Sequence, residues 1–195
     1  MEPKTKLETS PEEAKAIRER IRNVRVFNGV FGRARLARAE DAAAMLELFL
    51  DERVSAPVYT LPRPFSLESV RAWIADHERQ RQAGEGLLMC TYGTDGQMSS
   101  VSDFQFWPQW SAGEFGGVVA AHLQSQGYGG RGIKELCDWC FEHIGVRLLV
   151  MTSALDNVRS YKIFKSMGFQ EMGEIDSVRP DGKIRRSRYW ELIRA

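Results

Sequence analysis

A glycine-rich stretch, Gln124 to Gly132, lies between the apolar run Phe115 to Ala121 and a helical pattern from Ile133 to Ile144. Glycines at such a junction let backbone N–H groups approach an anion closely, because no Cβ stands in the way. The first turn of the following helix adds unpaired N–H donors and the positive end of the helix dipole. The sequence therefore predicts that a strand leads into a helix through a loop suited to a phosphate-bearing ligand.

The length and charge of the chain restrict its class. Its 195 residues fit one domain that can bury a substantial core without disulfides or metal. With 27 basic and 26 acidic side chains, it lacks the global positive field of a nucleic-acid-binding protein. No apolar run approaches the roughly 20 residues of a membrane span, and the polar start Met1 to Ser10 is unlike a signal peptide. We therefore expect a cytoplasmic protein that binds neither nucleic acid nor membrane.

The three cysteines are an odd and sparse set, unlike a secreted disulfide scaffold. Cys137 and Cys140 form a C-x-x-C motif, which in other contexts carries out redox chemistry or holds a metal. Both also fall on the apolar stripe of the 133–144 helical pattern, and the sequence has no second pair of ligands. We therefore expect buried thiols and no metal site.

Helix and strand signals alternate along the chain. Ser10-Pro11-Glu12-Glu13 is a helix start, with a capping serine and a proline in the first turn. Further helices are predicted for residues 39–50, 67–83 and 157–167, and strands for residues 33–37, 86–92, 98–106, 114–121, 147–153, 170–178 and 184–193. We expect an α+β fold, with an N-terminal helical extension over residues 1–30 and a single domain over residues 31–195.

Several short motifs follow one another in a fixed order. The glycine stretch fits the pattern Q/R-x-x-G-x-G/A, and an aromatic residue follows its first glycine. Upstream, residues 113–119 follow the pattern A-E-I-G-Y-x-V except at Gly117, and downstream come N-x-x-S, G-F and a closing hairpin. The matching residues are Glu114, Gln124, Gly127, Tyr128, Gly129, Asn157, Ser160, Gly168, Phe169, Gly173, Gly182 and Tyr189.

In combination these motifs resemble the GCN5-related N-acetyltransferase superfamily, and within it the branch of the ribosomal-protein N-terminal acetyltransferases, from Ala34 to Ile193. The resemblance implies a central mixed, mostly antiparallel sheet with a splayed parallel strand pair and flanking helices. It also implies acetyl-CoA as the cosubstrate. The implied cofactor-binding residues are Gly117, Val118, Val119, Gln124, Ser125, Gln126, Gly127, Tyr128, Gly129, Gly130 and Asn157.

The resemblance gives these residues distinct roles. Backbone amides of residues 125–130 would hold the pyrophosphate, and residues 117–119 would pair with the pantetheine arm. Asn157 would meet the pantetheine amides. The N–H of Gly117 would polarise the thioester carbonyl, an oxyanion-hole role.

Direct attack of a neutral amine on the thioester needs a proton acceptor and a proton donor for the leaving thiolate. Glu114 is the implied base, and the alternative is a solvated carboxylate at a strand edge. Phe164 occupies the position where much of the superfamily has a tyrosine. Ser160 is therefore the candidate for contact with the thiolate, the alternative being a small residue that lets its helix approach the ligand. Weaker candidates for the base are Asp103, His122, Glu174 and Asp176.

The acceptor is less constrained. Trp107 and Trp110 are expected to bind it, whereas Phe104 and Phe106, on one strand face, are expected in the core. By similarity to the branch, the acceptor is expected to be a protein or peptide N-terminus. The alternatives are a small-molecule amine of antibiotic or metabolite type, and a module that binds acyl-CoA without catalysis. The N-terminal helix is a candidate homodimer element.

Two other nucleotide-binding motifs are excluded by their context. Gly127, Gly129 and Gly132 also spell the dinucleotide motif G-x-G-x-x-G. That motif needs glycines early in the chain and an acidic residue at the end of the next strand, and neither is present. A P-loop fails because Ile133-Lys134 follows Gly132, where Lys-Ser or Lys-Thr is required.

Overall fold

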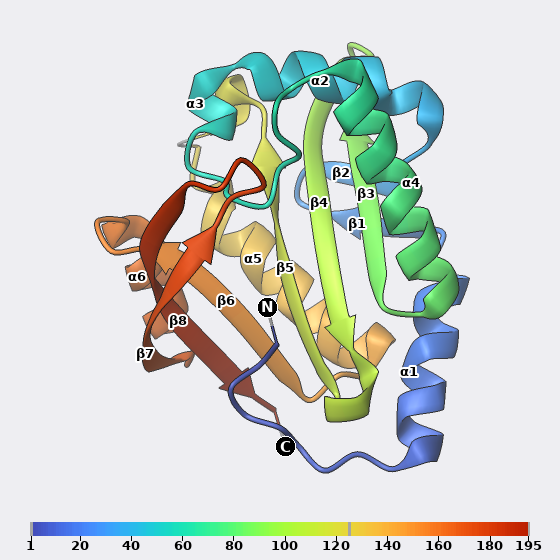
Figure 1. The fold of residues 1–195 in the computed structure, drawn as a ribbon, viewed down its shortest axis with the longest axis vertical. Coiled ribbons are helices and arrows are strands. Elements are labelled where there is room, and N and C mark those ends of the chain that lie inside the picture. The colour runs from blue at the N-terminus through green and yellow to red at the C-terminus, as the bar shows by residue number, and fades with distance from the viewer. Residues whose placement is uncertain (1, 125, 195) are drawn as a thin grey trace.

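The computed structural model describes residues 2–124 and 126–194, and within them one sheet of eight strands carries helices on both faces (Figure 1). The strand order is β1-β2-β3-β4-β5-β6-β8-β7. The strands are β1 (Val26–Gly29), β2 (Gly32–Leu36), β3 (Gly86–Tyr92), β4 (Met98–Trp107), β5 (Ala112–Val119), β6 (Leu148–Ala154), β7 (Gln170–Val178) and β8 (Ile184–Ile193). Neighbouring strands are antiparallel except β5 and β6, which confirms the expected mixed α+β fold.

The helices connect these strands. They are α1 (Pro11–Asn23), α2 (Ala42–Leu50), α3 (Glu52–Ser55), α4 (Leu67–Ala83), α5 (Tyr128–Trp139) and α6 (Val158–Ser166). Turns of 3-10 helix occur at Ala39–Asp41, Pro108–Trp110 and Ala121–Leu123, and a π-helical turn at Cys140–Ile144 extends α5. No helix in the described part of the chain is long and apolar enough to span a lipid bilayer.

Local signals set most of the helix ends. The Ser10 hydroxyl accepts a hydrogen bond from the Glu13 N–H at 3.1 Å, as the capping pattern predicts. Ser66 caps α4 in the same way by accepting from the Ser69 N–H, and Gly84 ends that helix in the left-handed conformation, with φ of 76°.

Two features differ from the prediction. Helix α5 begins at Tyr128, inside the glycine stretch, and not after it. The short elements β1 and α3 were not predicted, because each is too short to carry a periodic pattern. Strand β1 pairs with β2, so residue 30 falls in the turn of a hairpin. The division of the chain at that residue stays a prediction.

Two apolar layers cover the sheet. One contains Ile17 and Ile21 of α1, the α5 side chains and the α6 residue Phe164, and it includes Phe104 and Phe106, both at most 1% exposed. The other joins α2 and α4 to the opposite face. Figure 1 shows α4 in front of the sheet and α5 behind it. The two phenylalanines are therefore core residues, as predicted from their position on one strand face.

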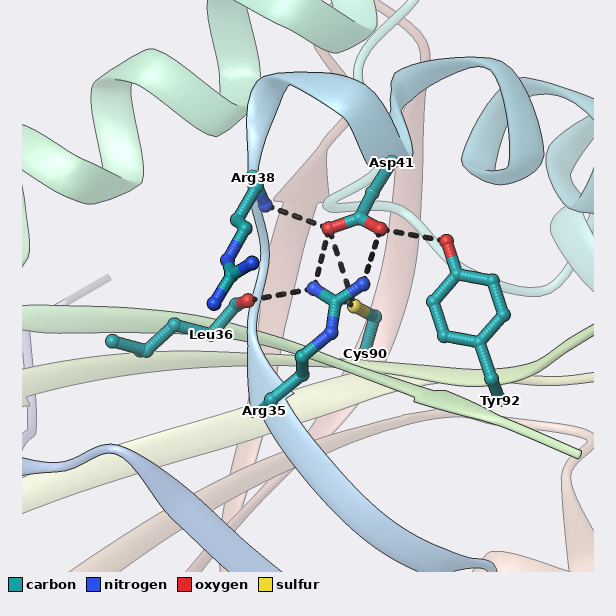
Figure 2. A network of polar contacts seen from close by, with 6 residues as sticks. All are labelled: Arg35, Leu36, Arg38, Asp41, Cys90 and Tyr92. Atoms are coloured by element: carbon teal, nitrogen blue, oxygen red, sulfur yellow. Dashed lines mark hydrogen bonds and ion pairs between the residues drawn. The ribbon is translucent and has the colours of Figure 1, made fainter.

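A buried carboxylate connects the first strands to α2 (Figure 2). Asp41 is 3% exposed, and both of its oxygens accept hydrogen bonds from the Arg35 guanidinium at 2.7 Å. The Tyr92 hydroxyl donates to Asp41 at 2.6 Å, and the Arg38 backbone N–H donates at 2.7 Å. Since these partners come from β2, β3 and the start of the helical segment, one side chain fixes all three relative to each other.

Candidate active site

Strands β5 and β6 pair over a short distance and then separate. Their register runs from Ala112 opposite Leu148 to Glu114 opposite Val150. Strand β5 continues to Val119 and β6 to Ala154, and among the described residues no further pair joins them. This gap is the splayed parallel pair that the sequence motifs imply.

The backbone of β5 presents hydrogen-bonding groups to this gap. The Ala120 N–H donates to the Ser99 carbonyl at 2.8 Å, so these residues are a hydrogen-bonded pair of the β4–β5 ladder. Such pairs alternate along antiparallel strands, and the β4–β5 register has no shift. Val118 therefore exchanges its hydrogen bonds with β4, whereas the N–H and C=O groups of Gly117 and Val119 point into the gap.

Only glycine fits at position 117. Its φ of 151° is rarely adopted by other residues. A Cβ added to Gly117 would also lie against the carbonyl oxygen of Val101, far inside van der Waals contact. The departure of Gly117 from the A-E-I-G-Y-x-V pattern thus has a steric cause, because β4 and β5 approach too closely for a side chain there.

The start of α5 lies beside this gap. Gly127 precedes the helix with φ of 83°, and residues 128–130 form its first turn. The N–H groups of a first helical turn have no acceptor within the helix, and the dipole adds partial positive charge there. A Cβ added to Gly129 would meet nothing within 4 Å, so the helix surface is open at this point.

The loop before α5 is held by its glutamines. The Gln124 side-chain N–H₂ donates to the Val119 carbonyl at 2.9 Å, and that of Gln126 donates to the His122 carbonyl at 2.7 Å. Ser125 and the side chain of Tyr128 lie outside the described part of the structure. Arg131 forms an ion pair with Glu135 at 2.9 Å.

A single cavity of about 650 Å³ connects these features. It extends from Gly129 and Gly132 of α5, past Gly117 of β5, to helix α4 and the loop over residues 57–60. Asn157 and Ser160 at the start of α6 also line it. The cavity thus joins a helix N-terminus to an open strand gap, and it has the size of a small-ligand or cofactor site.

Glu114 lies in this cavity at the point where β5 leaves β6. Burial raises the pKa of its carboxyl group from 4.5 to about 7. The positive charge of the chain's amino terminus opposes this shift, and the nearby charge of Asp103 adds to it. A carboxyl group with a pKa near 7 is present in both protonation states at neutral pH. Glu114 therefore has the properties of a general base.

A histidine to which the sequence analysis gave no role also lines the cavity. The His77 ring of α4 is within hydrogen-bond distance of Asp103, with 2.8 Å between Nε2 and Oδ1. Both residues line the cavity, and their side chains are only 7% and 16% exposed. Burial alone would lower the pKa of His77, but the hydrogen bond and charge of Asp103 raise it. The sequence signal that could have singled out His77 is its position as a polar residue on the apolar face of α4.

Comparison with known domains identifies the family. The profile of the acetyltransferase (GNAT) domain matches residues 33–170, which is more than half of the chain. The chain belongs to the GNAT family of N-acetyltransferases. The resemblance drawn from the sequence motifs is therefore confirmed. Comparison with curated protein sequences gave no match.

Solved GNAT structures share the fold. A ribosomal-protein-S5-alanine acetyltransferase from Vibrio fischeri superposes with a TM-score of 0.70 at 16% identity, covering 86% of this chain and 96% of that one. The RimJ protein of Mycobacterium smegmatis, solved with CoA-disulfide, gives 0.67 at 18% identity, covering 87% and 84%. RimL, a ribosomal L7/L12 α-N-protein acetyltransferase solved with CoA, gives 0.68 at 19% identity, covering 83% and 93%.

Helix α6 of this GNAT domain presents two of the predicted residues to the cavity. The Asn157 side-chain oxygen caps the helix by accepting from the Ser160 N–H at 3.0 Å, which leaves the Asn157 N–H₂ group for other partners. Phe164, where much of the family has a tyrosine, is 2% exposed and packs against Trp190 and Phe169.

The structure does not bring Trp107 and Trp110 to the cavity. Trp107 is 8% exposed in an apolar cluster with Tyr189, at the end of the sheet where β4 leads into β5. Trp110 packs under the ammonium group of Lys6, 3.3 Å from its ring centre. Other aromatic residues line the cavity, among them Trp73 of α4 and Tyr59 at its α4 end.

Other candidates also lie outside the cavity. His122 is exposed on the turn that follows β5, and Glu174 and Asp176 of β7 form ion pairs with Arg186. Cys137 and Cys140 are at most 2% exposed, and burial raises the pKa of both thiols, that of Cys137 to about 12. The buried position predicted for these cysteines is confirmed.

Proposed function

We propose that the protein transfers the acetyl group of acetyl-CoA to a primary amine by direct attack in a ternary complex, and that the acceptor is a protein or peptide N-terminus. The observation that carries this proposal is the continuity of one cavity. It joins the N-terminus of α5 and the open edge of β5 to a carboxyl group, Glu114, with a pKa raised to about 7. Each part matches one need of the reaction.

Acetyl-CoA would lie along the first half of the cavity. Its pyrophosphate would accept hydrogen bonds from backbone N–H groups at the start of α5, around Gly127 to Gly130 and the preceding glutamines. Gly117 and Val119 would pair with the pantetheine arm as an added strand. The N–H₂ group of Asn157 would donate to a pantetheine carbonyl. The N–H of Gly117 would donate to the thioester oxygen as negative charge develops on it.

The proton balance assigns a step to Glu114. The acceptor arrives as an ammonium ion and gives one proton to the Glu114 carboxylate, which frees the nitrogen lone pair. The nitrogen then attacks the thioester carbon, the C–N bond forms and the C–S bond breaks. The nitrogen loses a second proton, and the CoA thiolate takes up one. Ser160 is the candidate donor or hydrogen-bond partner for that thiolate. The products are an amide, CoA thiol and one released proton.

Release of CoA thiol in the presence of amines tests the proposal. An alanine-initiated peptide should stimulate thiol release, and the same peptide with an acetylated N-terminus should not. Glu114→Gln should lower kcat by about 100-fold, the usual contribution of a general base, with little change in the KM for acetyl-CoA. Glu174→Gln, an exposed carboxyl group of β7, is the matched control. Thiol release that no amine stimulates would contradict the proposal.

A small-molecule amine is the second candidate acceptor. Asp76, Asp103 and Glu114 line the cavity from α4, β4 and β5, and acidic walls favour a compact cation. The same assay separates the two, because a polyamine with a higher kcat/KM than the peptide would identify a small-molecule enzyme. The similar solved proteins that are named as ribosomal-protein acetyltransferases support a protein or peptide acceptor.

A further inference from the structure

The hydrogen bonds of His77 define where its protons are. Its Nδ1 is 3.0 Å from the Trp73 carbonyl oxygen, which can only accept, so Nδ1 carries a proton. Its Nε2 is 2.8 Å from Asp103 Oδ1. A bare nitrogen facing a carboxylate oxygen would be repulsive, so a proton must lie between these two atoms as well. Because a carboxylic acid is a stronger acid than an imidazolium ion, this proton resides on the histidine, and the pair is an imidazolium and a carboxylate.

This pair lies beside Glu114. Asp103 is opposite Gly116 in the β4–β5 register, two residues from Glu114 along β5. Side chains of directly opposed residues, and of residues two apart on one strand, project from the same face of a sheet. Asp103 and Glu114 are thus diagonal neighbours on one face, and both line the cavity.

We infer that His77 and Asp103 are a positioning pair for acetyl transfer: the Asp103 carboxylate, balanced by the His77 imidazolium, sets the pH at which Glu114 accepts the proton of the acceptor amine. The inference rests on the proposed role of Glu114 as the base. Without the histidine, two like charges would share the cavity. Without the aspartate, Glu114 would lose the neighbour that disfavours its ionised form.

Other charged and titratable groups face this part of the cavity. In the described residues they are Asp76 of α4, Tyr59 of the preceding loop, Arg185 of β8 and, toward the cofactor end, Glu135 of α5. Tyr189 of β8 also interacts with the Glu114 charge. Asp76 already forms an ion pair with Arg79 at 2.7 Å. None of these groups contributes to the pKa shift of Glu114 as Asp103 does: the Asp103 charge adds to burial in raising that pKa, and the positive charge of the amino terminus opposes it.

Two substitutions test the pair because they should move the pH profile in opposite directions. In the wild type, kcat/KM for the acceptor should rise with pH through about 7, as Glu114 ionises. Asp103→Asn removes the like charge and should move this acid limb down by roughly one to two pH units. His77→Gln removes the cation, leaving two coupled carboxylates, and should move the limb up by roughly one unit.

The controls separate this inference from the proposed function. Asp176→Asn, on the exposed edge strand β7, should leave the limb unchanged, and acetyl-CoA affinity should be the same in all four proteins. A limb that neither His77→Gln nor Asp103→Asn moves, or that both move in the same direction, would overturn the pair and leave the proposed function intact. A wild-type profile without an acid limb would overturn Glu114 as the base. If His77→Gln fails to fold, the shift in Asp103→Asn decides alone.

Discussion

At the scale of single residues, Asp41 shows how a buried charge is stabilised. Burial would raise the pKa of its carboxyl group, but hydrogen bonds from Arg35, Tyr92 and the Arg38 backbone lower it to about 2. Burying an ionised carboxylate is costly unless a counter-charge and hydrogen bonds compensate for its lost hydration. Asp41 has both, and removing one partner would leave a buried charge uncompensated. Cys90, which also contacts Asp41, has its pKa raised to about 12 by burial and by that carboxylate.

Asp41→Asn should lower the free energy of unfolding by about 3 kcal/mol, since it leaves the Arg35 cation without its buried partner. The folded pKa is below the unfolded value of about 3.9, so the ionised carboxylate stabilises the protein fully above that pH. This contribution is lost as the pH falls toward 2, and the variant should lack that part of the pH dependence. Urea unfolding at several pH values measures both effects. Asp138→Asn, at a half-exposed carboxylate of α5 that pairs with Lys134, is the control, and equal stability of the two variants would contradict the prediction.

The Ser160 hydroxyl can be removed without disturbing the cap of α6, because Asn157 accepts a hydrogen bond from the Ser160 backbone N–H and not from its hydroxyl. Ser160→Ala should therefore leave the melting temperature nearly unchanged. If the hydroxyl assists the leaving thiolate, kcat should fall by about 10- to 100-fold. Ser166→Ala, at the other end of α6, is the control. Undiminished turnover in Ser160→Ala would restrict Ser160 to a small residue beside the ligand.

At the scale of elements, α5 begins within its own glycines. Glycine in a helix costs roughly 0.5–1 kcal/mol relative to alanine, so local propensity favours a later start than the one observed. Two contacts explain the difference. Gly132 packs against the β1–β2 turn, where a Cβ would be 3.1 Å from Val30, and Gly129 faces the open cavity. Packing and ligand access, not helix propensity, therefore select these glycines.

Gly129→Ala should change stability and binding in opposite directions. The added methyl group has open space, so the free energy of unfolding should rise by roughly 0.5–1 kcal/mol, while acetyl-CoA affinity should fall because the methyl group enters the pyrophosphate site. Thermal unfolding and calorimetric titration with acetyl-CoA measure the two effects. Gly132→Ala in the same helix should destabilise the protein, because Val30 and Phe31 leave too little room. Unchanged affinity in Gly129→Ala would place the phosphates elsewhere.

At the scale of the whole molecule, the first residues are held against the last strand. The backbone N–H groups of Lys4 and Thr5 each donate to Glu191 Oε1 at 3.0 Å, and the Tyr189 hydroxyl donates to the same carboxylate at 2.9 Å. Glu191 is 3% exposed on β8. One buried acid thus connects the N-terminal segment to the strand that pairs with β6 and β7.

Glu191→Gln should lower the free energy of unfolding by about 2 kcal/mol, the usual worth of hydrogen bonds to a charged group. It should also make the chain before α1 sensitive to limited proteolysis, because two of its backbone anchors weaken. Glu2→Gln, an exposed residue paired with Lys6, is the control. Resistance to protease equal to that of the wild type would show that other contacts, such as those of Leu7, hold the segment.

The predictable part of the site is the part encoded by short spacings. The glycine stretch, Glu114, Asn157 and Ser160 were found because each belongs to a motif of a few residues, and the structure brings them to one cavity. The structure places Trp107 and Trp110 in a cluster at the end of the sheet and not in the cavity, and aromatic composition by itself does not distinguish these two positions. The sequence shows that residue 164 is a phenylalanine and so has no phenol group. It does not show that the Phe164 ring packs against Trp190.

The sequence by itself determined most of the helices and strands, the family and the presence of the glycine stretch at the start of α5, because caps, apolar periodicity and glycine spacing act over a few neighbouring residues. Only the tertiary structure decided which titratable groups meet. His77 and Asp103 are 26 residues apart and belong to a helix and a strand with no common motif. Their contact, and the burial that raises the pKa of Glu114 beside them, arise because α4 packs on the sheet. That packing cannot be predicted from the spacing of neighbouring residues in the sequence.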